Sequence, residues 1–281
     1  MKSNGEHIAP VKDMRNEFRI FTFNITDKEP ENSTPHRHNF HEIIFLEEGK
    51  ATHEIDGEYY EIKGPEVILV AQGKVHSFKV QAGAKGCIVR FSGSFLPENT
   101  ECLFSQFFFL SNIPVRCEEF REKIRSLLQL IFNADNEPDR KPAFIKYLLS
   151  AYVELLKDEK EKHFASANKA SKENYQLFNR FLMLVEAHFH DQQPVDFYAK
   201  TLNVTPRKLG EISKEVFGQS SSNVIDSRLM LEAKRLLLYT PQSIQEITYT
   251  LGFSDQSYFT KTFRKWEGLT PSEYRNRNKV A

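Results

Sequence analysis

The stretch SIQEITYTLGFSDQSYFTKTFRKWEGLTPSEYR, residues 243–275, decides the fold of the C-terminal part of the chain. Its first third predicts a short helix whose apolar face is formed by Ile244, Ile247 and Leu251. Gly252 predicts a tight turn and Ser254 a helix cap, after which a second helix buries Phe259 and Phe263. The pattern is helix, short turn, helix.

A similar unit precedes it in VDFYAKTLNVTPRKLGEISKEVFG, residues 195–218. Thr205 can cap a helix that starts at Pro206, and Gly218 suits the left-handed conformation that ends one. The helix predicted between the two units, NVIDSRLMLEAKRLLLYT, would act as a rigid spacer. A helix-turn-helix lays its second helix in the DNA major groove. One such pattern is a weak signal, but two around one long helix are much stronger.

Residues 244–275, with LMLEAKRLL before them, resemble the C-terminal signature of AraC-type bacterial transcription regulators, and the resemblance covers roughly residues 175–277. It implies an all-α domain with two helix-turn-helix units that binds double-stranded DNA. Carried over by position, the groove-facing residues are Arg207, Lys208, Glu211, Gln256, Ser257, Thr260 and Lys261. Arginine and lysine can read guanine and glutamine can read adenine, whereas Arg264 more plausibly meets phosphate.

Three positions depart from the family pattern. Glu211 is acidic where a basic or amide residue is usual, Gly210 has no side chain, and Ser213 replaces an aromatic core residue. A carboxylate can accept from cytosine but repels phosphate. We therefore rely more on the second recognition helix than on the first.

The N-terminal part, from about residue 17 to residue 92, reads as short strands separated by glycine, proline or charged turns. This spacing favours a β-sandwich or barrel. Asp56-Gly57 joins two of the strands and suits the positive φ angles of a tight hairpin turn.

PHRHNFHE, residues 35–42, concentrates histidine and glutamate in this part of the chain. His36, His38 and Glu42, followed by Gly49, resemble the first motif of the cupin barrel. AQGKVH resembles the second motif through Gly73 and His76, although Ala71 stands where proline is usual. Strand alternation should point His38, Phe40 and Glu42 to one side and His41 to the other.

The cupin resemblance leaves two interpretations open for His36, His38, Glu42 and His76. AraC-type regulators often have a cupin-like sensor at this place, so we expect these residues to line the pocket of a small-molecule effector, without a cofactor. Three imidazoles and a carboxylate would also suit a divalent metal ion. The competing function is therefore a cupin metalloenzyme with an accessory helical domain, but we expect a regulator and no enzyme.

The remaining segments set the expected organisation. Two amphipathic helices follow the barrel, and the polar segment ASANKASK, residues 165–172, separates them from the C-terminal helices. We expect an α+β protein with a cupin-like sensor domain (1–117), a helical connector that dimerises (118–171) and a DNA-binding domain (172–281).

Composition is consistent with that organisation. The chain is 40% hydrophobic and 27% charged and has no apolar run of membrane-spanning length and no signal peptide, so we expect a cytoplasmic protein without a membrane partner. A net charge of zero argues against a protein that coats nucleic acid, although the part after residue 171 is about +3. Cys87, Cys102 and Cys117 lack metal-like spacing. RNA polymerase is a further candidate partner.

Overall fold

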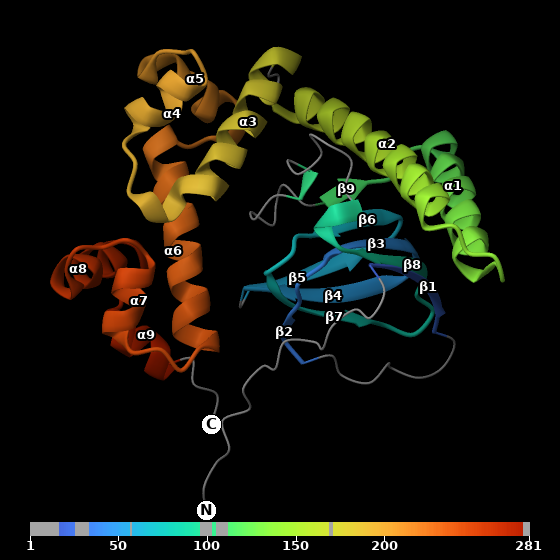
Figure 1. Cartoon of the computed structure of the whole chain (residues 1–281), viewed down its shortest axis with the longest axis horizontal. Helices are drawn as coiled ribbons and strands as arrows, with labels where there is room; N and C mark the ends of the chain where they lie inside the picture. Colours follow the sequence, from blue (N-terminus) through green and yellow to red (C-terminus); the bar gives the residue numbers. More distant parts are fainter. Residues whose placement is uncertain are drawn as a thin grey trace, which may run out of the picture. The chain divides into compact units, whose positions relative to one another are not determined.

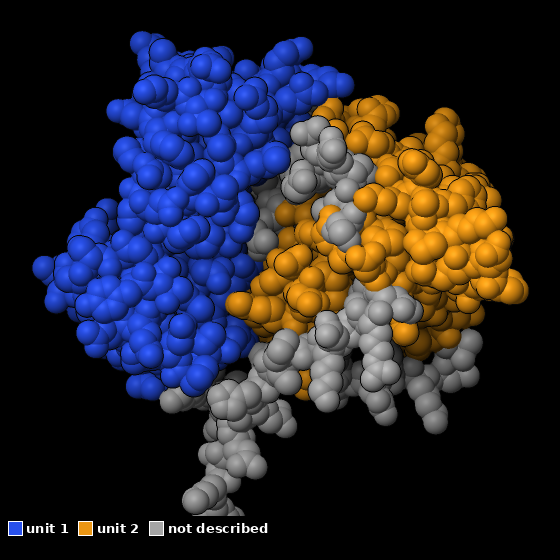
Figure 2. Space-filling view, in the orientation of Figure 1, with its two compact units in different colours: residues 1–8, 168–281 blue, residues 9–167 orange. Residues whose placement is uncertain are grey.

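The computed structural model describes residues 17–25, 34–56, 58–95, 103–104, 112–168 and 171–277. The described residues up to 167 belong to one compact unit and those from 168 onward to another (Figure 2). The division falls within the polar segment 165–172.

The N-terminal unit contains two antiparallel sheets (Figure 1). Its strands are β1 (Phe18–Asn24), β2 (His36–Arg37), β3 (His41–Glu48), β4 (Lys50–Ile55), β5 (Glu58–Lys63), β6 (Glu66–Val70), β7 (Val75–Val80), β8 (Lys85–Phe91) and β9 (Asn112–Pro114). The strand orders are β1-β8-β3-β6-β9 and β2-β7-β4-β5. The predicted β-rich fold is confirmed, but the sequence did not predict the short strands β2 and β9.

The hairpin between β4 and β5 pairs Ile55 with Glu58, and Asp56 has a φ of 52°. A positive φ is what a tight hairpin turn requires of this position. Gly57, the second predicted turn residue, lies outside the described residues, as does Cys102.

Strand β3 is buried on both of its faces, as expected of a central strand covered on two sides. Ile44 and Leu46 belong to a core shared by strands of both sheets, together with Ile68 and Ile62. The alternate residues, including Ile43, belong to a second core that also contains residues of the two connector helices. The two faces of one strand therefore serve two separate cores.

The connector helices α1 (Glu118–Asn136) and α2 (Pro142–Asn168) pack beside the five-stranded sheet (Figure 1). Phe120, Ile124, Leu149 and Tyr152 are their deeply buried contributions to the second core. A short 3-10 helix η1 (Gly93–Phe95) contributes Phe95 to the same core.

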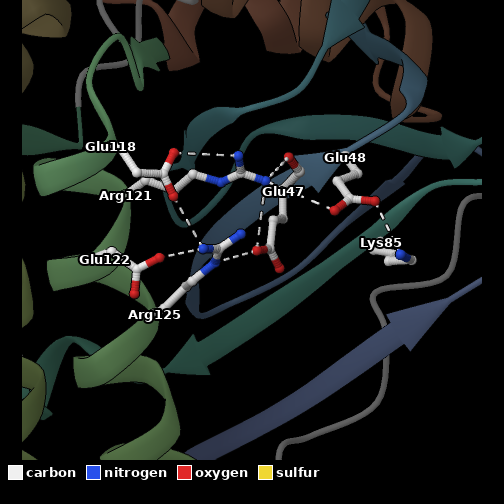
Figure 3. Close-up of polar contacts among 7 residues, drawn as sticks. All are labelled: Glu47, Glu48, Lys85, Glu118, Arg121, Glu122 and Arg125. Carbon is white, nitrogen blue, oxygen red and sulfur yellow. Dashed lines mark hydrogen bonds and ion pairs between the residues drawn. The ribbon is translucent and has the colours of Figure 1, made fainter.

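Ion pairs also attach α1 to the end of β3 (Figure 3). Arg125 of α1 binds the Glu47 carboxylate, and Arg121 donates to the Glu47 backbone oxygen at 3.5 Å. Glu48 binds Lys85 of β8 at 3.0 Å. These side chains are partly exposed, so the network fixes geometry more than it adds stability.

The C-terminal unit consists of helices. They are α3 (Lys172–His188), the 3-10 helix η4 (Phe189–Asp191), α4 (Val195–Thr201), α5 (Pro206–Phe217), α6 (Ser221–Tyr239), α7 (Ile244–Thr250), α8 (Gln256–Glu267) and α9 (Pro271–Arg277). Helices α4 and α5 form the first predicted helix-turn-helix, and α7 and α8 the second, with α6 between them (Figure 1). The predicted all-helical fold is confirmed.

The helix boundaries follow the predicted signals with one correction. The Thr205 hydroxyl accepts a hydrogen bond from the backbone nitrogen of Lys208, and Gly218 ends α5 with a φ of 75°. The cap of α8 is Asp255, whose side chain accepts from the backbone nitrogen of Tyr258 at 2.8 Å, and so the prediction of Ser254 was wrong. A carboxylate at the helix start also interacts favourably with the helix dipole, which a hydroxyl does not.

Gly252, in the turn of the second unit, has a φ of 75°. A Cβ atom at this position would lie 1.9 Å from the backbone oxygen of His190 in η4. The turn therefore needs glycine both for its conformation and for its close contact with η4.

Helix α6 is buried on several sides. Arg228, which is 3% exposed, binds both Glu186 carboxylate oxygens at 2.7 and 2.9 Å and lies 4.0 Å from the centre of the Phe189 ring. A bidentate arginine of this kind holds α6 against α3 with defined geometry.

Within the described residues, every helix is too short or too polar to cross a lipid bilayer.

Candidate functional sites

The first candidate surface is the exposed face of α5. Leu209, Ile212 and Val216 point into the core and leave Arg207, Lys208 and Glu211 exposed. Ser213, the departure from the family's aromatic residue, is fully buried and donates its hydroxyl proton to the Leu209 backbone oxygen at 2.8 Å.

The acidic residue on this face has a partner. Arg207 donates through Nε to the Glu211 carboxylate at 3.0 Å, and both side chains are largely exposed. An exposed pair at this spacing adds little stability. It does reduce the net positive charge that α5 presents.

Helix α8 provides the second surface. Phe259 and Phe263 are fully buried, whereas four of the predicted contact residues are exposed and one is partly buried. The exposed ones are Gln256, Ser257, Lys261 and Arg264, and the partly buried one is Thr260. Exposed donors on one helix face, backed by a rigid aromatic core, are what direct reading of base edges requires.

The histidines predicted from the sequence gather inside the N-terminal unit. His36 of β2 and His76 of β7 are direct cross-strand neighbours, and their rings lie 4.8 Å apart. His38, two residues beyond His36, reaches the same place, where its Nε2 lies 2.9 Å from Nε2 of His76. The Glu42 carboxylate approaches from β3, at 3.7 Å from His76 Nε2.

Two further residues belong to this histidine cluster and were not predicted from the sequence. His53 of β4 lies behind His76, with its Nε2 3.0 Å from His76 Nδ1. Arg90 pairs with Glu42 across β3 and β8 and donates to Glu42 Oε1 at 2.6 Å. Both depend on strand register, and neither lies in a recognisable motif.

His41 is separate from the cluster, as strand alternation predicted. Its ring packs against Phe91 and Phe104, which belong to the core shared with the connector helices. Burial lowers the pKa of His41 to about 4, so it is a neutral packing residue near pH 7.

Burial is also the largest influence on the pKa values of the buried groups in the cluster. It lowers the pKa of His38 to about 4 and that of His76 to about 3, although the nearby Glu42 carboxylate acts in the opposite direction. For Glu42, burial favours the neutral form, but His76 and Arg90 hold its pKa below the usual value. Near pH 7, His38 and His76 are therefore neutral imidazoles, and Glu42 is a carboxylate paired with Arg90.

The donor set fits a metal ion. His36, His38 and His76 each offer one nitrogen, and these atoms lie within 4.8 Å of one another. Neutral imidazole and carboxylate are common ligands of divalent first-row metals, and two nitrogens bound to one ion at about 2.1 Å lie about 3 Å apart. Such an ion would supply a fixed divalent charge inside the unit.

Comparison with known proteins gives the family. A family model described as a helix-turn-helix domain matches residues 198–277, and one described as an AraC-like ligand binding domain matches residues 25–146. The HTH-type transcriptional activator RhaS of Escherichia coli is 23% identical over 253 residues, which cover 85% of this chain and 86% of that protein.

Solved structures give similar matches. The C-terminal domain of AraT from Geobacillus stearothermophilus is 29% identical, covers 37% of this chain and 88% of that chain, and has a TM-score of 0.36. ToxT from Vibrio cholerae is 17% identical, covers 94% of this chain and 99% of that chain, and has a TM-score of 0.42.

Together the two family models cover more than half of the chain, in the order that its two units have. The matched proteins regulate transcription, so the alternative of a cupin metalloenzyme is not supported. The chain belongs to the AraC family of transcription regulators, with an N-terminal AraC-like ligand-binding domain of cupin-like fold and a C-terminal helix-turn-helix domain, and it is not an enzyme.

Proposed function

We propose that the chain is a sequence-specific regulator that binds double-stranded DNA through α5 and α8 and senses a small effector in its N-terminal unit. The observation that carries the DNA-binding role is the pair of exposed polar faces on α5 and α8, each backed by buried apolar residues. In this assignment 1–117 is the sensor, 118–171 the connector and 172–281 the DNA-binding domain.

On each proposed recognition helix, some side chains would contact bases and others phosphate. Gln256 would read adenine with two hydrogen bonds, and Thr260 would contact a thymine methyl group. Lys261 would face the groove, where a lysine can read guanine. Arg264 would bind phosphate, which fixes the register of the protein on the duplex. On α5, Arg207 and Lys208 would contact guanine or phosphate, with Glu211 orienting Arg207, and Ser257 would add a hydroxyl at the start of α8.

We assign effector sensing to His36, His38, Glu42 and His76 because these polar groups meet at one place, where three of them are buried and His36 is partly buried. An effector acts only if it binds one arrangement of the protein better than another. The relative named a transcriptional activator suggests RNA polymerase as a partner, and DNA as a target implies the cytoplasm of a bacterium.

Dimerisation would occur through the connector. Phe144 and Tyr147 lie three residues apart on α2 and are 49% and 75% exposed, and Leu130 of α1 is 51% exposed. Large apolar side chains on a helix surface favour an interface with another chain.

The test is DNA binding by fluorescence anisotropy, with a duplex selected from a random pool. Affinity should fall steeply as salt rises, because phosphate contacts release counterions. Arg264→Ala should weaken binding of all sequences to a similar degree and reduce the salt slope by about 1. Lys141→Ala changes an exposed lysine of the other unit and should leave both unchanged. Binding that is independent of salt and of sequence would refute the proposal.

A further inference from the structure

Two of the three histidines that can hold an ion, His36 and His38, are held in the same way. In His36, Nδ1 donates to the Thr34 backbone oxygen at 3.1 Å, and in His38, Nδ1 donates to the Phe40 backbone oxygen at 2.8 Å. Since a carbonyl only accepts, neutral His36 and His38 carry their proton on Nδ1 and have an unprotonated Nε2. A metal-binding imidazole needs this tautomer, with the outer nitrogen fixed by a hydrogen bond.

His76 differs because its outer contact is another histidine. Unprotonated Nε2 of His38 must accept from Nε2 of His76, which lies 2.9 Å away. Neutral His76 then has an unprotonated Nδ1, which accepts from Nε2 of His53 at 3.0 Å. Without a metal ion, the proton of His76 therefore occupies the nitrogen that faces the cluster.

We propose that a divalent first-row transition-metal ion is bound by His36, His38 and His76. In this proposal His53 is a positioning residue, which accepts a hydrogen bond from Nδ1 of His76 and so leaves Nε2 of His76 free to bind the ion. For Nε2 of His76 to bind, the His76 proton must move to Nδ1, which then needs an acceptor. His53 becomes that acceptor when its own proton moves from Nε2 to Nδ1. Each imidazole carries one proton before and after, so the protons balance.

The surroundings of the cluster support this role. His53 is fully buried and its ring packs edge-on against Phe78, which fixes where its Nε2 points. Glu42 can add a fourth donor through Oε2, because Arg90 occupies its Oε1. His53 lies outside the two sequence motifs that carry the cupin resemblance. The proposal deepens the effector-sensing role, and its biological meaning rests on that proposed function.

The experiment uses the full chain, stripped of metal with a chelator and titrated with Co²⁺. The visible absorption of Co²⁺ reports its coordination by imidazole, and elemental analysis gives the number of ions bound per chain. We expect one Co²⁺ per wild-type chain and loss of binding in His38→Gln and His76→Gln. His53→Phe, which removes the acceptor, should weaken Co²⁺ affinity about 10- to 100-fold.

The recovery variant is His53→Gln, because its amide oxygen can accept the Nδ1 proton of His76. It should restore most of the affinity that His53→Phe loses. His41→Gln is the matched control, since His41 is a partly buried histidine of β3 that lies outside the cluster. The Co²⁺ affinity of this variant should equal that of wild type. If circular dichroism shows that His53→Phe does not fold, His53→Leu takes its place.

Folded wild-type protein that retains no stoichiometric Co²⁺ or Zn²⁺ would overturn the metal site. Equal affinity in wild type and in His53→Phe or His53→Leu would overturn the positioning role. DNA binding is measured separately on the same samples. DNA binding by wild type without stoichiometric metal would refute this inference alone, whereas metal binding without DNA binding would refute the proposed function alone.

Discussion

At the scale of single residues, the two recognition helices differ in how freely their polar groups can meet DNA. Arg207 is engaged with Glu211, so in the proposed complex it would contact DNA only in the direction that this ion pair allows. Gln256 is exposed at the first turn of α8. We therefore expect base discrimination to depend more on α8 than on α5.

Gln256→Ala should relax the preference at one base position, at a cost of about 1–3 kcal/mol for a lost bidentate contact. Competition between duplexes that differ at single positions measures this effect. Gln176→Ala alters an exposed glutamine of α3 and should change nothing. If the Gln256→Ala variant kept the full wild-type preference at every position, the assignment of Gln256 to a base would be wrong.

Residue patterns predicted part of the histidine cluster. His36, His38, Glu42 and His76 stand in short motifs, and the structure brings them together. His53 and Arg90 could not be found in this way, because they meet their partners through strand register across 23 and 48 residues. Register depends on the packing of whole strands, which a local pattern does not specify.

At the scale of elements, the turn of the second helix-turn-helix has the strictest requirement. Gly252→Ala would place a methyl group against the His190 backbone oxygen and would also strain a positive φ. We expect a loss of about 1–3 kcal/mol in the stability of the C-terminal unit and weaker DNA binding.

Trp266 in α8 is the single tryptophan of the chain, so its fluorescence reports the unfolding of this unit. Gly210→Ala is the control, since a Cβ there meets nothing within 4 Å and alanine favours a helix. An unchanged melting temperature in Gly252→Ala would contradict the steric argument.

Local signals located most elements. Short strand-like runs bounded by glycine, proline or charged turns predicted the longer strands, and helix caps predicted α5 through Thr205 and Gly218. The short strands β2 and β9 were missed because two or three residues carry no measurable period. Helix ends are uncertain by one or two residues when they are predicted from the sequence, and the cap of α8 is accordingly Asp255 and not Ser254.

At the scale of the whole molecule, the proposed role of the connector is to join two chains into a dimer. Phe144→Ser combined with Tyr147→Ser should weaken the proposed dimer at least about tenfold, or about 1.4 kcal/mol, because two exposed apolar side chains are removed from α2. Sedimentation equilibrium measures the change.

Tyr59→Ser is the matched control, because Tyr59 is 69% exposed but belongs to β5 of the four-stranded sheet and not to the connector. It should leave the dimer unchanged. A wild-type protein that is monomeric at micromolar concentration would rule out this interface.

The length of α6 limits which sequence changes the C-terminal unit can tolerate. Its 19 residues span about 28 Å, and each residue contributes about 100° of rotation. Substitutions on its surface should change little. An insertion or deletion of one residue would turn one of the two proposed recognition helices away from the DNA face that we propose for both. The number of residues in α6 is therefore constrained even where its surface residues can vary.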